Sequence, residues 1–344
     1  MKILIVRVGA MGDVLHALPA VAALREARLD WVIDWAVDPR WEALLADRGH
    51  GPVVNRVHLV RTRKWAKAPI SWATLKSVLA LRRKLRAAKY DLVVDMQGTL
   101  RSAVIGWMAG AKKFVGYGDP RESAAALFYK TKAVRQGQHV VEQGAALLGE
   151  ACGVALKPRP AALPRVEWAE NWAEQEAVVK RPLCVLGAGA GWGAKQWPVA
   201  RFGSLAQRIR AMGFDVVVNA PRKDDAVANA VVDASDGAAR IVVCNVAGLV
   251  ALLRRTDLFV GGDSGPTHLA STLAVPLVAL FGPTDPARNG PWGPGICRVL
   301  RDPGSVTSYK RTAEPEAKLA KLPVEDVVEA IWEVLPPISG DLRE

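Results

Sequence analysis

The stretch Gly261-Gly262-Asp263-Ser264-Gly265-Pro266-Thr267-His268 joins residues 256–260, which end in Leu258-Phe259-Val260, to small and apolar residues at helical spacing, 269–274. This order predicts a buried strand, a glycine turn and a helix, with Ser264 as the cap and proline tolerated in the first turn. The free N–H groups and the positive end of the helix dipole would then face an anion such as a diphosphate. An ordinary tight turn that closes a βα unit fits the same residues equally well.

The length and composition indicate a globular protein of about two domains. The chain has 344 residues, of which 50% are hydrophobic, enough for a core in each domain and too many for a disordered chain. The N-terminal apolar run, residues 3–6, is too short for a signal peptide and leads into a glycine turn, which indicates a first strand. No run reaches the roughly 18 apolar residues of a membrane span. We therefore expect a cytoplasmic protein.

The positive charge is concentrated in one segment. The formal net charge is +12, and residues 61–90 contain ten lysines and arginines and no acidic residue. Such a segment favours an anionic partner, which could be a membrane surface, a phosphorylated substrate or a nucleic acid. Trp65 and Trp72 lie among these charges and suit an interface as well as a core, whereas a solvated helix face is the better interpretation of residues 76–89. We predict ligand contacts for the cations that directly follow a strand end: Arg61, Arg63 and Lys64.

Alternation of apolar strands and helices predicts an α/β fold. Apolar runs separated by helical patterns are typical of a parallel sheet covered on both faces, and a proline-rich break near residues 155–166 predicts a boundary between two such series. We expect two doubly wound, Rossmann-like domains facing across a cleft, with ligands at the carboxyl ends of the strands. The expected division is a domain over 1–160, a second over 161–335 whose last helix, 324–335, could pack back on the first domain, and a tail over 336–344 that looks frayed.

The expected elements follow from the hydrophobic periodicity. Strands are predicted at 2–6, 31–37, 56–60, 92–94, 113–116, 183–186, 215–219, 241–243, 258–261 and 277–281. Helices are predicted at 14–27, 39–46, 70–88, 100–109, 139–152, 167–179, 199–212 and 324–335.

Two N-terminal loops place polar residues after a predicted strand. In Gly9-Ala10-Met11-Gly12-Asp13 a carboxylate stands at a helix N-terminus, where the dipole favours its ionised form. Such a carboxylate can take a proton from a hydroxyl nucleophile, although a simple N-cap fits this loop slightly better when it is taken alone. In Asp95-Met96-Gln97-Gly98 the spacing favours a turn with a capping aspartate.

The loop over residues 187–198 presents one lysine. It is not a dinucleotide fingerprint, because Trp192 stands at the place of the third glycine, and it is not a P-loop, because Lys195 lies between Ala194 and Gln196. What remains is a loop that can offer Lys195 to a phosphate as a point charge. No His, Cys and carboxylate cluster has metal-ligand spacing, and Gly-x-Ser-x-Gly is absent from the sequence. We expect group transfer without a metal or a covalent intermediate.

Several motifs together resemble those of the bacterial lipopolysaccharide heptosyltransferases. They occur in order and at sensible spacing over nearly the whole chain: Met11–Ala20, Lys195-Gln196-Trp197-Pro198, Gly262–His268 and Val278-Ala279-Leu280-Phe281-Gly282. A second set resembles the branch of the family that adds the first heptose more than the branch that adds the second: Arg121-Glu122-Ser123, Leu127-Phe128-Tyr129, Asp95–Gly98 and the cations at 61–64.

The resemblance implies a GT-B fold and an inverting transfer of heptose from ADP-heptose to the Kdo residue of Kdo-lipid A. The enzyme would be a peripheral, monomeric protein on the cytoplasmic face of the inner membrane, with no metal and no other cofactor. Asp13 would be the general base. The residues implied for the donor are Gly12, Gly191, Lys195, Asp263, Ser264, Gly265, Thr267 and His268, and those implied for the anionic acceptor are Arg61, Arg63, Lys64, Gln97 and Arg121.

Two departures from the family pattern accompany this resemblance. The loop before the lysine has Ala190 and Gly191 where the family often offers hydroxyl groups, so backbone N–H groups would have to replace them. The acid expected to bind the ribose could be either Asp224 or Asp225.

Three other functions remain open from the sequence. The chain could be a heptosyltransferase acting later in the core, a nucleotide-sugar epimerase on the same fold, or a non-catalytic nucleotide binder at a membrane. The basic residues at 61–67 speak against an epimerase, which needs no basic acceptor face. Nucleic-acid binding is not expected, because the basic residues accompany no recognised nucleic-acid module.

Overall fold

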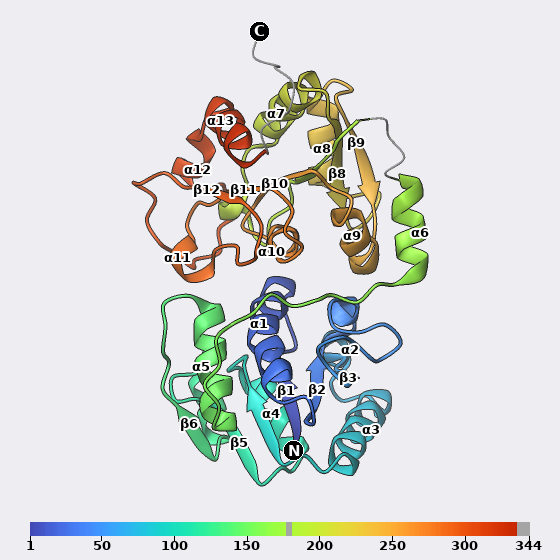
Figure 1. Cartoon of the computed structure of the whole chain (residues 1–344), viewed down its shortest axis with the longest axis vertical. Helices are drawn as coiled ribbons and strands as arrows, with labels where there is room; N and C mark the ends of the chain where they lie inside the picture. Colours follow the sequence, from blue (N-terminus) through green and yellow to red (C-terminus); the bar gives the residue numbers. More distant parts are fainter. Residues whose placement is uncertain (177–180, 336–344) are drawn as a thin grey trace. The chain divides into compact units, whose positions relative to one another are not determined.

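The computed structural model describes residues 1–176 and 181–335. Contacts divide the chain into two compact units, Met1–Arg165 and Val166–Glu344, each built on its own sheet (Figure 1). Residues 177–179 of the helix predicted over 167–179 and the tail predicted over 336–344 lie outside the described residues.

Unit 1 is a six-stranded parallel sheet in the order β3-β2-β1-β4-β5-β6. Its strands are β1 (Lys2–Val6), β2 (Val32–Val37), β3 (Arg56–Leu59), β4 (Leu92–Asp95), β5 (Lys113–Tyr117) and β6 (Thr131–Ala133). Its helices are α1 (Met11–Ala27), η1 (Pro39–Leu44), α2 (Thr62–Lys67), α3 (Trp72–Ala87), α4 (Leu100–Met108), η2 (Ser123–Leu127) and α5 (Val140–Cys152).

Unit 2 is a second six-stranded parallel sheet, in the order β12-β11-β10-β7-β8-β9. Its strands are β7 (Leu183–Gly187), β8 (Asp215–Ala220), β9 (Ala239–Val243), β10 (Leu258–Gly262), β11 (Leu277–Leu280) and β12 (Cys297–Leu300). Its helices are α6 (Glu167–Glu176), η3 (Gly193–Lys195), α7 (Val199–Ala211), α8 (Ala226–Ala234), α9 (Val246–Leu253), α10 (Gly265–Thr272), α11 (Pro286–Asn289), α12 (Ala317–Lys321) and α13 (Val324–Val334).

The two sheets have the same topology. When the strands of each unit are numbered from its first strand, both orders become 3-2-1-4-5-6, the doubly wound Rossmann arrangement. The strand order therefore reverses beside β1 and β4 in unit 1, and beside β7 and β10 in unit 2. Ligands of such sheets bind outside the carboxyl ends of the strands at this reversal, so the loops after these four strands are the first places to look for a site.

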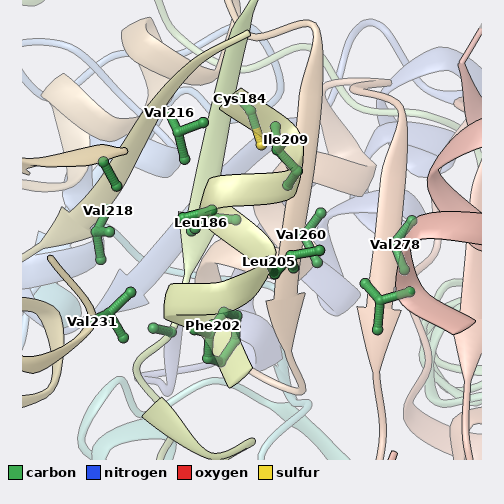
Figure 2. Packing of buried hydrophobic residues seen from close by; sticks show 14 of the residues in the cluster. Cys184, Leu186, Phe202, Leu205, Ile209, Val216, Val218, Val231, Val260 and Val278 are labelled. Atoms are coloured by element: carbon green, nitrogen blue, oxygen red, sulfur yellow. The ribbon is translucent and has the colours of Figure 1, made fainter. Parts of the chain in front are cut away.

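Helices cover both faces of each sheet, as the continuous apolar strands predict. In unit 1, Leu4 and Val6 of β1 pack with α3 and α4, while the alternate residues Ile3 and Ile5 are buried against the opposite face. Figure 2 shows the matching core of unit 2, where Phe202 and Leu205 of α7 lie over the valines and leucines of the central strands.

The structure corrects several sequence expectations. Helix α1 begins at Met11 and not at residue 14, so Asp13 lies inside its first turn and is not the N-cap. The predicted helix at 70–88 begins at Trp72, after the separate short helix α2. The last helix, α13, packs against α7, β11 and β12 of its own unit. The short elements α2, β6, α8, α9 and β12 were not predicted.

Within the described residues, no helix combines the length and the apolar character that a membrane crossing requires.

Candidate active site

Polar residues from the sequence analysis follow the four strands that flank the two reversal points. Asp13 follows β1 and Gln97 follows β4 in unit 1, while Lys195 follows β7 and Asp263 follows β10 in unit 2. The loops chosen from sequence are therefore the loops that the topology favours for ligand binding.

Asp263 is the centre of the polar cluster in unit 2. It forms an ion pair with Lys195; the Asp263 side chain is buried, and the Lys195 side chain is 11% exposed. Thr284 donates a hydrogen bond to Asp263 Oδ2 at 2.6 Å, and His268 Nε2 lies 3.3 Å from Asp263 Oδ1. Burial by itself would raise the pKa of this carboxyl group, but His268 and then Lys195 hold the pKa well below its usual range. Asp263 therefore carries a negative charge that orients a lysine and a histidine.

The turn into α10 is organised by Thr267 more than by Ser264. Ser264 occupies the N-cap position, as expected, but its side chain makes no capping hydrogen bond. Its hydroxyl lies 3.2 Å from the hydroxyl of Thr267, and Thr267 donates to the carbonyl of Gly262. Since the Ser264 side chain does not cap the helix, the first N–H groups of α10 are available for an anion.

The loop that carries Lys195 is packed closely against the β10–α10 turn. A Cβ on Gly262 would lie 3.0 Å from the carbonyl oxygen of Lys195, so glycine is needed for this approach. Trp192 lies beside two cations: Lys195 Nζ is 4.1 Å and Arg311 Cζ is 5.4 Å from its ring centroid. These contacts add Trp192 and Arg311 to the residues around the cluster.

Residues 311–316 pack over the same loop. Ala194 donates its backbone N–H to Thr312, and Glu316 donates its backbone N–H to Ala194, at 3.3 and 3.2 Å. A Cβ on Gly193 would overlap the carbonyl group of Ala313. A Cβ on Gly191 would meet nothing within 4 Å, so Gly191 is not required for packing in this structure.

These two glycines give a matched pair of variants. Gly193→Ala is expected to displace residues 311–316 and to lower the free energy of unfolding by about 1–3 kcal/mol, because the new methyl group meets a backbone atom that cannot rotate away. Gly191→Ala should change it by less than about 0.5 kcal/mol, as for an exposed substitution. Urea unfolding, monitored by circular dichroism, measures both free energies. Equal effects of the two substitutions would contradict the close packing of Gly193 against Ala313.

Arg7 connects the two candidate loops of unit 1. Its guanidinium group pairs with Asp13, with Nη2 2.8 Å from Oδ1, and it also donates to the carbonyl of Met96 after β4. The second oxygen of Asp13 accepts the backbone N–H of Ala10 at 3.0 Å. The Asp13 side chain is 39% exposed, so its carboxylate is held from one side and open to solvent on the other. The sequence analysis did not identify Arg7.

Gln97 is held in place by a buried carboxylate. Asp95 Oδ1 accepts the backbone N–H groups of Gln97 and Gly98, and its Oδ2 accepts the hydroxyl groups of Ser102 and Tyr129. Burial raises the pKa of Asp95 despite these four donors. The side chain of Gln97 accepts the backbone N–H of Val8 at 2.7 Å and donates to Thr99. Gln97 therefore links the β4 loop to the β1 loop.

The remaining cations chosen from sequence lie at the same carboxyl edge of the sheet in unit 1. The positive charges of Arg61 and Arg63 act on the acidic residues after β2, Glu42 and Asp38 respectively. Lys64 is exposed on α2. Arg121 is exposed after β5, and its backbone N would lie 3.1 Å from a Cβ on Gly98, next to Gln97.

Two further expectations concern a ribose ligand and a metal. Asp225 uses Oδ1 to cap α8 through the N–H of Ala228, and Asp224 is exposed and paired with Arg222, so the geometry does not choose between the two acids. Among the residues that the structure describes, no group of three or more His, Cys, Asp or Glu side chains is arranged to hold a metal ion.

The two parallel sheets with flanking helices, each with its polar loops at the reversal of strand order, define a GT-B glycosyltransferase fold. The chain belongs to glycosyltransferase family 9, the heptosyltransferases, whose family model matches residues 78–317.

Named heptosyltransferases are similar to this chain in sequence and in structure. The chain is 31% identical to lipopolysaccharide heptosyltransferase 1 of Pseudomonas aeruginosa over 91% of this chain and 87% of that protein. Two solved structures of the E. coli heptosyltransferase WaaC match 97% of this chain and 99% of theirs. The structure with ADP has a TM-score of 0.80 at 25% identity, and the structure with ADP-2-deoxy-2-fluoro heptose has a TM-score of 0.74 at 26% identity.

Proposed function

We propose that this protein transfers a heptose from ADP-heptose, with inversion, to the Kdo residue of Kdo-lipid A in synthesis of the lipopolysaccharide inner core. The observation that carries the proposal is the buried Lys195–Asp263 pair beside the start of α10 in a family 9 chain. A buried lysine next to free helix N–H groups favours a diphosphate, and the relatives named above include a heptosyltransferase solved with ADP.

In the proposed mechanism, unit 2 binds the donor and unit 1 binds the acceptor. The proposed donor residues of unit 2 are Gly191, Lys195, Asp263, Ser264, Gly265, Thr267 and His268. Lys195 and the first N–H groups of α10 offset the charge that develops on ADP as it leaves. Asp263 does not contact the phosphates through its carboxylate but orients Lys195 and His268.

Asp13 is the proposed general base. Inversion in one step requires an acceptor hydroxyl to attack the anomeric carbon while a base removes its proton. The Asp13 carboxylate is exposed on one side and fixed by Arg7 on the other, so it can meet a hydroxyl in a defined orientation. Arg7 is then a positioning residue and not a catalytic one.

The proposed location of the enzyme in the cell follows from its proposed acceptor. We place the enzyme as a peripheral, monomeric protein at the cytoplasmic face of the inner membrane, and we propose that it needs no metal ion. Kdo-lipid A is anionic, and the cations at the carboxyl edge of unit 1 suit its phosphate and carboxylate groups.

A turnover assay tests the function directly. Purified full-length protein with ADP-heptose and Kdo-lipid A should release ADP and add one heptose to the acceptor, as seen by mass spectrometry. Transfer only to an acceptor that already carries heptose would favour an enzyme of later core synthesis. A change of the donor sugar without any acceptor would favour the epimerase, and nucleotide binding without turnover would favour a non-catalytic binder.

The acceptor assignment predicts a selective kinetic effect. Replacing Arg61, Arg63 and Lys64 together by glutamine should raise the acceptor KM about tenfold or more while the affinity for ADP stays unchanged, because these exposed cations lie in unit 1. Rising salt should weaken the parent in the same way, since exposed charges are screened within about 8–10 Å at ordinary ionic strength. An acceptor KM that responds to neither change would make these cations a solvated surface.

A further inference from the structure

The outward side of α3 is apolar at positions where a surface helix is normally polar. The helix packs Leu81 and Leu85 against the sheet. Trp72, Leu75 and Leu79 fall on the opposite side at 3.6 residues per turn, and all three are exposed, Trp72 to 68%. Helix α3 already packs against unit 1 through Leu81 and Leu85 on its other side. Packing within unit 1 therefore does not explain the exposed apolar stripe.

Helix α4 carries a second apolar stripe beside the first. Leu100, Val104 and Trp107 repeat at helical spacing and are exposed, Trp107 to 53%. Helices α3 and α4 contact each other and pack into one core cluster on one face of the sheet, so both stripes point away from the sheet on the same side. We call this surface the outer α3–α4 face; its apolar residues are Trp72, Leu75, Leu79, Leu100, Val104 and Trp107.

The outer α3–α4 face is also basic. Lys76, Arg83 and Arg86 of α3 are exposed on the same side as its apolar stripe, and Lys76 Nζ lies 5.7 Å from the ring centroid of Trp72. Residues 61–90 contain no acidic residue that could neutralise these cations within the segment. Ile70, just before α3, is 98% exposed.

This combination of charge and apolar side chains selects the occupant. A second copy of the chain docked through the same face would bring the like charges of α3 together, and residues 61–90 contain no acid to compensate them. A nucleic acid would match the cations but not a stripe of leucine and valine. An anionic bilayer matches both features, because tryptophan and leucine enter the boundary between headgroups and acyl chains while lysine and arginine meet the phosphates.

We propose that the outer α3–α4 face docks the protein on an anionic phospholipid bilayer. This inference rests on the proposed function, because docking would serve transfer to a lipid acceptor. It names the surface through which the peripheral protein contacts the membrane. Helix α4 begins directly after the Gln97 turn, and Arg101 of α4 donates to Thr62 of α2 at 3.4 Å. The face therefore adjoins the residues proposed for the acceptor, which suits an acceptor that is itself anchored in lipid.

Vesicle flotation without donor or acceptor tests the surface separately from the enzyme activity. The full-length protein should float with vesicles of phosphatidylcholine and phosphatidylglycerol in a ratio of about two to one, and bind phosphatidylcholine alone at least about tenfold more weakly. Replacing Trp72, Leu75 and Leu79 together by serine should weaken binding to the mixed vesicles about tenfold or more. Replacing Lys76, Arg83 and Arg86 together by glutamine should weaken it about fivefold per charge, most strongly at low salt.

Matched variants on other surfaces keep the proposal falsifiable. Trp332→Ser removes a tryptophan that is also about half exposed, and glutamine at Lys132, Arg208 and Lys223 removes three exposed cations; both should bind vesicles like the parent. Circular dichroism should show that all variants are folded. Vesicle binding that survives both α3 variants, binding that the control variants lose equally, or a dimer in sedimentation velocity that the serine variant abolishes would each overturn the proposal. Loss of vesicle binding with retained turnover of a delipidated acceptor would support it, whereas absence of turnover in the parent would affect only the proposed function.

Discussion

Asp13→Asn is expected to lower kcat by about 10²–10⁴-fold, the contribution of a general base. Asparagine keeps the size of the side chain and an oxygen that can accept the N–H of Ala10, so α1 should retain its first turn. It cannot accept a proton from the acceptor hydroxyl at neutral pH. Affinity for ADP should stay within a few-fold of the parent, because the proposed diphosphate contacts come from unit 2. Steady-state assays of heptose transfer measure kcat, and calorimetry measures ADP affinity.

An exposed carboxylate beyond the other end of α1 supplies the control for this variant. Asp30→Asn removes an exposed acid from the same unit and should leave kcat unchanged. Arg7→Met should lower kcat less than Asp13→Asn does, because the base remains but loses the partner that orients it. If Asp13→Asn turned over within a few-fold of the parent, Asp13 would be only a residue of the first helical turn, and another base would have to be sought.

The parallel sheets could be predicted from the sequence because their central strands are buried on both faces. A segment such as Leu92–Val94 is apolar without interruption, and the period of the helices between strands is clear. The two strands missed, β6 and β12, each lie at one edge of a sheet, whereas the strands at the opposite edges, β3 and β9, were predicted. Edge strands bury less side-chain surface, so Thr131–Ala133 has little hydrophobic pattern to read.

The site could be predicted only at the level of its loops. Strand-end glycines and isolated charged residues pointed to Asp13, Lys195 and Asp263. Their partners Arg7 and Thr284 could not be found, because the spacing between partners depends on the fold and not on local pattern. Ala313 is a clearer case, since nothing in its own segment indicates that its carbonyl group requires a glycine at position 193.

The ion pair within unit 2 also changes how a substitution of Lys195 should be interpreted. Lys195→Ala removes the cation proposed for the diphosphate, but it leaves Asp263 buried with His268 and Thr284 as remaining partners. The negative charge of Asp263 would then stand near the donor phosphates without its lysine. Two effects therefore act against ADP in the same variant, and both have the same sign.

Lys195→Ala is accordingly expected to weaken ADP binding by about 1.5–3 kcal/mol, the range for a hydrogen bond to a charged group, which corresponds to about 10–150-fold in Kd. The acceptor KM should change little, because the proposed acceptor residues lie in unit 1. Calorimetry with ADP measures the effect, and Lys321→Ala, which removes an exposed lysine from the same unit, should bind ADP like the parent. Since Asp263 repels phosphate once Lys195 is lost, the double variant Lys195→Ala, Asp263→Asn should recover part of the affinity. Unchanged ADP affinity in Lys195→Ala would remove this lysine from the donor site and leave the ion pair with a purely structural role.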